Sequence, residues 1–289
     1  MSIIVTEHLQ YVYGENTPFQ KAALSDVSLS MEAGERIGII GHTGSGKSTL
    51  VQHLNGLLRP TSGRVLLDGK DIWADPKQIR AVRFRVGLVF QYPEYQLFED
   101  TVYKDISFGP RNMGLDEEEI DRRVREAAKM VELPDDLLDK SPFDLSGGEK
   151  RRAAVAGIMA MRPEVMILDE PTAGLDPKGR DTILSLIRQY GEQTGATMLF
   201  VSHSMEDIAL LAQKVLVMNQ GQAVMYAPTQ EVFARARELR DMGLDVPAIT
   251  QVFLGLRERG LPVREGIYTL DAGVEEIRRL RRERGRDRA

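Results

Sequence analysis

Apolar and polar residues alternate along the first part of the chain. The alternation runs from Ile3 to Val12 and again from Val27 to Met31, and a period of two is typical of strands with one buried face. The turn-rich segment GENTP lies between the two runs. The first 35 residues are therefore expected to form antiparallel strands.

From Arg36 onward, short apolar runs alternate with segments of helical periodicity. The apolar runs predict strands over 37–40, 64–67, 86–90, 165–168 and 198–201. Helices are expected from Lys47 to Leu58 and from Pro177 to about Gln193. This alternation predicts a parallel sheet covered by helices. A last pair of strands is expected over 214–218 and 222–226.

Helical patterns dominate two further regions. A charged helical pattern from Asp116 to Glu132 lies within a mostly helical stretch, which predicts a helical subdomain inserted at about residues 92–163. Beyond Pro228 the composition shifts toward Arg and Glu. We therefore expect a main α/β domain over residues 1–227 and a small helical domain over residues 228–289.

The composition limits the classes of protein to consider. The 289 residues are 42% hydrophobic, which suits a globular protein with a substantial core. The net charge of -5 gives no general electrostatic footprint for nucleic acid. The chain has no cysteine, which excludes disulfides, zinc–thiolate sites and thiol nucleophiles. It has no signal-like N-terminus and no apolar run near about 18 residues, so a cytoplasmic location and a peripheral membrane role are expected.

The stretch GHTGSGKST matches the pattern G-x-x-x-x-G-K-[ST] between a predicted strand and a predicted helix. Glycines let backbone N–H groups surround a phosphate, and the helix directs its positive end toward the same anion. Lys47 is expected to hold the β- and γ-phosphates, Ser48 to ligate Mg²⁺ and Thr49 to add a donor. The alternative is a glycine-rich turn that only links strand and helix. The candidate phosphate-binding residues are Gly41, His42, Thr43, Gly44, Ser45, Gly46, Lys47, Ser48 and Thr49.

Two carboxylates follow the apolar run 165–168. Asp169 and Glu170 are expected at the carboxyl edge of the predicted sheet, where ligands bind in such folds. Asp169 would hold Mg²⁺ directly or through water, and Glu170 would act as the general base for the attacking water. The alternative is a pair of acids that cap a helix beside Pro171.

The segment Leu145–Arg152 has the sequence LSGGEKRR, and it resembles the LSGGQ signature of the ABC ATPases. Glu149 stands where glutamine is usual, a departure found among family members. The resemblance implies that Ser146, Gly147, Gly148 and Glu149 bind the γ-phosphate of an ATP held by a partner subunit. It also implies a P-loop ABC ATPase fold: a mostly parallel sheet, an N-terminal antiparallel β subdomain, an inserted helical subdomain and a small helical C-terminal domain.

Further positions match this family one by one. Tyr13 resembles the aromatic residue that stacks on adenine, although neighbouring Tyr11 keeps the choice open and a core role is the alternative. Gln91 resembles the glutamine that senses Mg²⁺ and the attacking water, and its alternative is a solvated strand end. Gln91 therefore joins Ser48 and Asp169 in the predicted metal site.

Two matches lie after the paired carboxylates. Asp176 resembles part of the loop that crosses the dimer interface, and it is also suited to cap a helix at Pro177. His203 resembles the switch histidine near the γ-phosphate, with a structural histidine as the alternative. The predicted catalytic residues are thus Glu170, His203 and Gln91.

Several segments narrow the resemblance to one group within the ABC ATPases. The segment Phe90–Phe98 is similar to that of energy-coupling factor (ECF) transporter ATPases. The segments 141–144, 169–180 and 243–247 resemble the second of the two ATPase paralogues in that group, and the similarity is weakest after Leu261. This implies an ATP hydrolase, with Mg²⁺, that drives uptake of a vitamin or transition-metal ion at the cytoplasmic face of the cell membrane. The implied partners are a second ATPase subunit, identical or paralogous, a transmembrane coupling subunit and a substrate-binding membrane subunit.

Two regions are predicted to contact these partners. The aromatic segment Tyr92–Phe98 is expected to pass the stroke of the ATPase to the membrane partner, and the alternative is that its rings pack inward. An apolar stripe in the C-terminal region is usually core, and the resemblance implies that it also holds two ATPase subunits together. The stripe comprises Val246, Ile249, Val252, Phe253 and Leu256, preceded by Val232, Phe233 and Leu239 on another helix.

The Arg-rich end, residues 277–289, is expected to be a solvated helix with a frayed tail, and contact with anionic lipid is the alternative.

The competing function is an ABC-type, ATP-gated clamp that acts on nucleic acid or ribosomes. Such clamps carry long coiled-coil insertions or two ATPase domains in one chain, whereas an ordinary helical insert separates Lys47 from Ser146 here. The negative net charge also argues against nucleic acid as a partner. A regulatory subunit with a dead site is disfavoured because Glu170 and His203 are both present. The sequence therefore favours transport.

Overall fold

The computed structural model describes residues 1–286 of the chain. Its N-terminal layer is an antiparallel sheet in the order β2-β1-β4-β5. The pairing of β1 with β2 confirms the antiparallel strands predicted for the first 35 residues. The strands of this sheet are β1 (Ser2–Tyr13), β2 (Lys21–Glu32), β4 (Ser62–Leu67) and β5 (Lys70–Asp71).

The second sheet has the order β10-β9-β3-β8-β7-β6 among the described strands. Neighbouring strands are parallel except β9 and β10, which form an antiparallel hairpin. The central strands are covered on both faces, and this explains why they are continuous apolar runs. The strands are β3 (Arg36–Ile40), β6 (Val86–Val89), β7 (Val165–Asp169), β8 (Thr197–Val201), β9 (Lys214–Asn219) and β10 (Gln222–Pro228).

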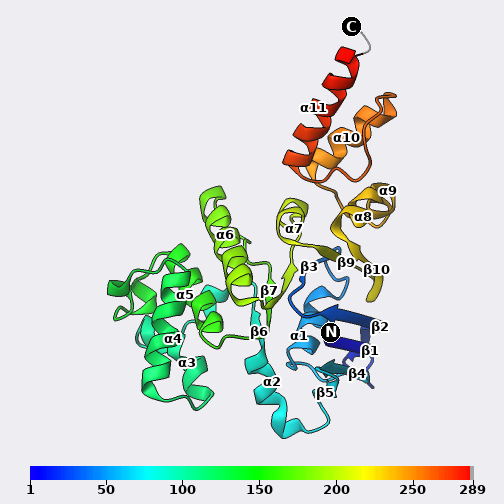
Figure 1. Ribbon diagram of the computed structural model, residues 1–289. Helices are drawn as coiled ribbons and strands as arrows, with labels where there is room; N and C mark the ends of the chain where they lie inside the picture. Colours follow the sequence, from blue (N-terminus) through cyan, green and yellow to red (C-terminus); the bar gives the residue numbers. More distant parts are fainter. Residues whose placement is uncertain (287–289) are drawn as a thin grey trace.

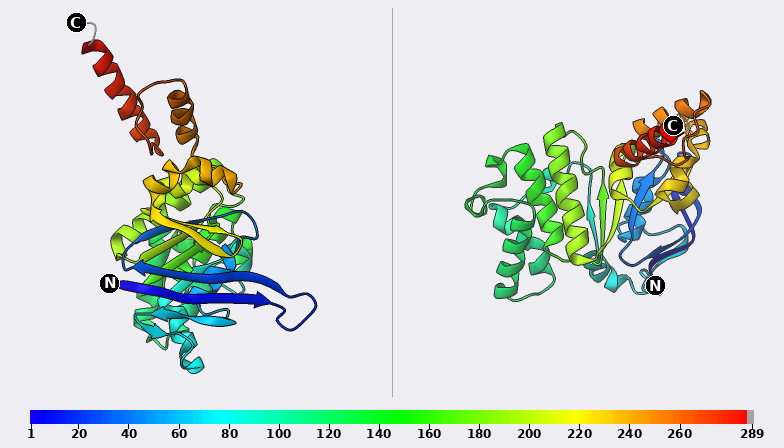
Figure 2. Two further views of the ribbon diagram at one scale, coloured as in Figure 1. Left: turned by 90° about the vertical axis from the view of Figure 1, so that its right-hand side faces the viewer. Right: turned by 45° about the horizontal axis from the view of Figure 1, so that its top comes forward.

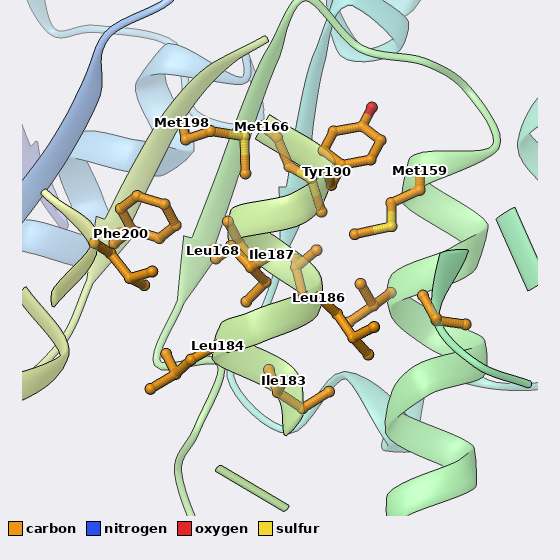
Figure 3. Packing of buried hydrophobic residues seen from close by; sticks show 14 of the residues in the cluster. Met159, Met166, Leu168, Ile183, Leu184, Leu186, Ile187, Tyr190, Met198 and Phe200 are labelled. Atoms are coloured by element: carbon orange, nitrogen blue, oxygen red, sulfur yellow. The ribbon is translucent and has the colours of Figure 1, made fainter. Parts of the chain in front are cut away.

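Helix α6 (Pro177–Thr194) covers one face of the parallel sheet. Its apolar side chains recur every three to four residues and pack on the strands, so tertiary packing stabilises the helix. Asp176 caps its start, and Gly195, with a φ of 68°, ends it. Figure 3 shows Ile183, Leu184, Leu186, Ile187 and Tyr190 of α6 near Met166 and Leu168 of β7, Met198 and Phe200 of β8, and Met159.

Shorter helices complete the sheet domain: α1 (Lys47–Leu54), α2 (Ile79–Arg85) and α7 (Met205–Leu211). Helix α1 ends at Leu54, so the predicted end at Leu58 was wrong. Gly56 has a φ of 70°, and this left-handed conformation stops the helix.

The helical subdomain is inserted between β6 and β7. Figure 1 shows it on one side of the parallel sheet, opposite the antiparallel sheet. Its charged helix is capped by Asp116, whose carboxylate accepts the N–H of Glu119 at 2.8 Å. The helices are α3 (Val102–Asn112), α4 (Glu117–Met130) and α5 (Gly147–Met159).

The C-terminal region is helical, and its last two helices project from the body of the molecule (Figure 2). The expectation that Val232, Phe233 and Leu239 share one helix was wrong, because the chain leaves helical geometry at Arg235 (φ -86°, ψ 39°). The helices are α8 (Thr229–Ala234), α9 (Ala236–Asp241), α10 (Ala248–Glu258) and α11 (Leu270–Arg286). Residues 287–289 of the Arg-rich end lie outside the described residues.

Two hydrophobic clusters divide this region. Phe233, Leu239 and Val246 are buried in the large cluster that includes α6 and the sheet. Phe253 and Leu280 belong to a separate small cluster formed by α10, α11 and the segment between them. The helices α8 and α9 therefore pack on the main domain, whereas α10 and α11 pack mainly on each other. No helix within residues 1–286 combines the length and the apolar character needed to cross a membrane.

Candidate active site

The predicted site residues follow strands whose carboxyl ends meet at one edge of the parallel sheet. The phosphate-binding stretch follows β3, Gln91 follows β6, Glu170 follows β7 and His203 follows β8. These strands are neighbours in the order β3-β8-β7-β6. The topology thus brings together segments that are far apart in the sequence.

The phosphate-binding stretch forms a tight backbone turn before α1. Gly46 has a φ of 101°, and a Cβ at this position would lie 2.6 Å from the carbonyl oxygen of Ala23. Only glycine fits this turn, which leaves backbone N–H groups at the positive end of α1. Lys47 is buried, and its Nζ donates to the carbonyl oxygens of Gly41 at 2.7 Å and His42 at 3.1 Å. The buried Ser45 Oγ has no hydrogen-bond partner among the described residues.

The paired carboxylates lie beside this turn. Burial raises the pKa of Asp169, and a hydrogen bond from Ser48 and the charge of Lys47 partly oppose this rise. Burial also raises the pKa of Glu170 to about 7, although the backbone N–H of His203 acts to lower it. Glu170 has a φ of 54°, an uncommon conformation for a non-glycine residue. A carboxyl group with such a pKa can accept a proton near neutral pH.

His203 stands next to these carboxylates. Its Nε2 lies 3.5 Å from Oε1 of Glu170, and its side chain is about half exposed. Burial and the charge of Lys47 lower its pKa, so the ring is mostly neutral at neutral pH. A neutral imidazole can donate one hydrogen bond to a ligand bound next to Glu170.

Tyr13 lines a crevice of about 210 Å³ together with Gly44, Lys47 and Thr49. Its hydroxyl lies 3.2 Å from Oγ1 of Thr49, and the residue is 42% exposed. Tyr11 instead packs against the core and makes an edge contact with His53, with ring centroids 4.7 Å apart. Of the two tyrosines, Tyr13 is the one that borders the phosphate-binding turn.

The signature segment lies apart from this turn, at the start of α5 in the helical subdomain. Ser146 and Glu149 form a capping box: Ser146 Oγ accepts the backbone N–H of Glu149 at 3.4 Å, and Oε2 of Glu149 accepts the backbone N–H of Ser146 at 2.8 Å. Ser146, Gly147 and Gly148 are exposed. No hydrogen bond or ion pair between described residues joins the signature to the phosphate-binding turn.

Two further predicted residues are placed by the structure. Gln91 is exposed just beyond β6, next to the end of β7. Asp176 caps α6, where its Oδ1 accepts the N–H of Gly179 at 2.7 Å. The capping role is therefore present in the single chain.

Two buried charges beside the site were not singled out from the sequence. Arg151 in α5 and Asp207 in α7 both bond to the segment that follows Glu170. Arg151 lies within the signature segment, but the partners of both charges are distant in the sequence and no local motif indicates these contacts.

A parallel sheet with a phosphate-binding turn after one strand (β3) and paired carboxylates at the same edge after another (β7, beyond β8) defines a P-loop ATPase. The ABC transporter family profile matches residues 24–173. The chain is 50% identical over 279 residues to the energy-coupling factor transporter ATP-binding protein EcfA2 of Caldanaerobacter subterraneus subsp. tengcongensis, covering 96% of this chain and 98% of that protein.

Solved structures give the same result. The chain is similar to cbiO1 from Clostridium perfringens, part of the ABC transporter complex cbiONQ, with a TM-score of 0.73, 41% identity and coverage of 83% of this chain and 94% of that chain. It is also similar to the ATP-binding cassette MJ0796 in a dimeric post-hydrolysis state bound to ADP and Pi, with a TM-score of 0.70, 26% identity and coverage of 78% and 98%.

The chain therefore belongs to the ABC transporter ATPases and, within them, to the ATP-binding proteins of energy-coupling factor transporters. It binds ATP, and its ATP hydrolysis is coupled to transport. The predicted fold class and the predicted enzyme class are confirmed.

Proposed function

We propose that each ATP is bound between the phosphate-binding turn of this chain and the signature of a second ATPase subunit. The contrast between a buried Lys47 and an exposed Ser146 supports this arrangement, because the signature offers N–H groups that its own chain leaves free. The dimeric state of the similar cassette MJ0796 also supports it. The second subunit is identical or paralogous, and Asp176 lies in the loop that crosses to it.

Within this sandwich, Glu170 is the general base that takes a proton from the attacking water. The place of Glu170 carries this assignment: it directly follows β7 beside the phosphate-binding turn, and its Oε1 lies 3.5 Å from Nε2 of His203. Its raised pKa agrees with this role. Gln91 and His203 orient the water and the γ-phosphoryl group from the neighbouring strand ends. The residues 41–49 hold the phosphates, Tyr13 stacks on adenine, and residues 146–149 act on the ATP of the partner subunit.

The residues beside the turn suit a magnesium ion. Ser48 and Asp169 supply a hydroxyl and a carboxylate beside the turn, and Gln91 supplies an amide oxygen. Hard oxygen donors of this kind, with few carboxylates, are what Mg²⁺ uses when phosphates complete its shell. When bound, Mg²⁺ would neutralise charge on the β- and γ-phosphates.

We further propose that the segment Tyr92–Phe98 contacts the transmembrane coupling subunit. Tyr95 is 83% exposed and Phe98 is 59% exposed, although Phe98 also packs edge-on against Phe108. A crevice of about 280 Å³ beside these rings is lined mainly by apolar residues. Exposed aromatic rings beside an apolar crevice are typical of a protein interface.

The remaining assignments complete this proposal. Residues 1–227 form the nucleotide-binding domain, with the helical subdomain at about 92–163, and residues 228–289 form a helical domain that keeps two ATPase subunits together. The partly exposed Val252, Leu270 and Val274 on α10 and α11 support such a contact. The complex acts at the cytoplasmic face of the cell membrane, and a separate membrane subunit binds the cargo, a vitamin or a transition-metal ion. Nucleic acid is not a partner.

The substitution Glu170→Gln tests the catalytic assignment. We expect the variant, purified with its membrane partners, to hydrolyse ATP about 100- to 1000-fold more slowly and to accumulate an ATP-bound dimer. Glu164→Gln is the matched control, because Glu164 lies at the opposite end of β7 and is paired on the surface with Arg85. Equal hydrolysis by wild type and Glu170→Gln would rule out Glu170 as the base.

A further inference from the structure

The segment that follows Glu170 is held on one side by a single buried guanidinium. Nη1 of Arg151 donates to the carbonyl oxygens of Ala173 at 2.7 Å and Pro171 at 3.3 Å. Arg151 belongs to α5 of the helical subdomain, and its side chain is 3% exposed. The peptide groups next to the catalytic carboxylate are therefore bonded to a residue of another subdomain.

The other edge of the same guanidinium bonds to Glu94. Nε of Arg151 donates to Oε2 of Glu94 at 3.0 Å, and Nη2 donates to Oε1 at 2.6 Å. Burial acts to raise the pKa of Glu94, but the hydrogen bonds and charge of Arg151 outweigh it and hold the pKa below its usual range. Glu94 is therefore an ion-pair partner inside the chain, between the exposed rings of Tyr92 and Tyr95.

A second anchor holds the same segment from the opposite side. Oγ1 of Thr172 donates to Oδ2 of Asp207 at 2.8 Å, and Nε of Arg180 donates to Oδ1 of Asp207 at 2.7 Å. Asp207 lies on α7, close after His203. The segment 171–173 is thus fixed both to the sheet domain and, through Arg151, to the segment that faces the membrane partner.

We propose that Arg151 is a positioning residue that transmits displacement of the segment Tyr92–Phe98 to the carboxylate of Glu170. If Glu94 moves, Arg151 either follows it and pulls on the carbonyl groups of Pro171 and Ala173, or stays behind as a buried guanidinium without its carboxylate partner. The second outcome is costly, since breaking one side of a buried ion pair strands the other charge. A displacement of Glu94 is therefore transmitted through Arg151 to the segment 171–173. This inference depends on the proposed roles of Glu170 and of the segment 92–98.

The geometry requires arginine at this position. The planar guanidinium uses separate edges for the carboxylate and for the two carbonyl groups. A lysine ammonium is a point charge that can keep the pairing with Glu94 but cannot span both sides. The variant Arg151→Lys is therefore expected to keep the ion pair with Glu94 but to lose the hydrogen bonds to the segment 171–173. It tests the contribution of the link between the two segments apart from that of the ion pair.

The experiment measures kcat, KM and the melting temperature of Arg151→Met, Arg151→Lys and Glu94→Gln in the complex with the membrane partners. For Arg151→Met we expect kcat to fall about 10- to 100-fold with KM for ATP nearly unchanged, because a small misplacement of Glu170 slows the chemical step without removing phosphate contacts. For Arg151→Lys we expect the melting temperature to recover but kcat to remain low. The double variant of Glu94 and Arg151 is expected to be no slower than Arg151→Met.

Arg123→Met is the matched control. Arg123 is also a largely buried arginine of the helical subdomain, with 14% of its side chain exposed, but within residues 1–286 it bonds only to Glu119 and to the carbonyl oxygen of Met161. We expect it to lower the melting temperature with kcat close to wild type. The proposal is overturned if Arg151→Met lowers kcat no more than Arg123→Met, or if Arg151→Lys restores kcat. Loss of hydrolysis in Glu170→Gln alongside either result would leave the proposed function standing.

Discussion

The phosphate-binding turn and the signature both place backbone N–H groups at a helix start. Within one chain, however, the two regions differ in how far their residues are buried. The turn is partly enclosed: Lys47 and Ser45 are buried although three residues of the stretch 41–49 are exposed, and the residues around them follow strands of the same sheet. The signature is open: Ser146, Gly147 and Gly148 are exposed on a helical subdomain at the side of the sheet (Figure 1).

This difference shows what each region can do alone. An enclosed turn with a buried lysine is preorganised for phosphate and can bind nucleotide without a partner. An exposed helix start has little to hold a phosphate by itself, since water competes for its N–H groups. Under the proposed sandwich, nucleotide binding therefore belongs to one chain, whereas hydrolysis needs two.

The largest expected effect comes from disabling the two regions separately. Lys47→Ala removes a charge from the turn, so we expect ATP binding by the purified chain to weaken about 10- to 100-fold. Ser146→Arg blocks the signature, so we expect binding by the purified chain to change less than about 2-fold while hydrolysis by the complex falls about 100-fold or more. Calorimetry gives the binding constants and phosphate release gives the rates.

Ser146→Ala serves as a second variant, because it removes the hydroxyl without adding bulk and should slow hydrolysis less than Ser146→Arg. If Ser146→Arg weakened nucleotide binding by the isolated chain as much as Lys47→Ala, the signature would act on the ATP of its own chain. The distinction between the two regions would then be lost.

The enclosed region also predicts a dependence of stability on pH. Folding raises the pKa of Glu170 from an ordinary value of 4.5 to about 7, so its contribution to stability is present below the unfolded pKa and is lost as pH rises through about 7. Each pKa unit corresponds to about 1.4 kcal/mol, which gives about 3 kcal/mol for this change. Without nucleotide, Glu170→Gln should therefore match wild type near pH 4, below the unfolded pKa, and exceed its free energy of unfolding by up to about 3 kcal/mol near pH 8.

Urea unfolding at several pH values checks this expectation. Glu164→Gln should show no growing difference, because Glu164 is exposed and paired with Arg85. A constant offset between Glu170→Gln and wild type from pH 5 to pH 8 would contradict the raised pKa of Glu170.

The sequence was most informative where local chemistry and topology coincide. Apolar runs followed by a glycine-rich turn or by Asp169 and Glu170 predicted both the strands and their shared carboxyl edge, because parallel strands place their ends together. The sequence left Tyr11 and Tyr13 undecided, since the choice depends on which ring borders the turn. The helical pattern also placed the end of α1 too late, because apolar periodicity continues to Leu58 whereas the left-handed conformation of Gly56 ends the helix before it.

Long-range polar contacts lay beyond the sequence. Arg151 and Glu94 are 57 residues apart, and neither belongs to a pattern that indicates a pair. The same holds for Thr172 and Asp207, which are 35 residues apart. Such contacts depend on how the helical subdomain packs against the sheet domain, and hydrophobic periodicity does not specify that packing.

The smallest expected effect concerns the residue that departs from the usual signature. Hydrogen bonds from Ser146 hold the pKa of Glu149 below its usual range, so the residue is ionised in the segment that we propose to contact the partner's γ-phosphate. Glu149→Gln keeps the acceptor for the N–H of Ser146 and removes the charge, so in a Glu170→Gln background we expect dimerisation to need about 2- to 5-fold less ATP.

Glu118→Gln, on the exposed face of α4, is the matched control and should leave the ATP requirement for dimerisation unchanged. Analytical ultracentrifugation across ATP concentrations measures the shift, which should shrink in high salt because exposed charges are screened. An unchanged ATP requirement would mean that Glu149 lies outside the field of the partner's phosphate, and the open region would then act through its backbone N–H groups alone.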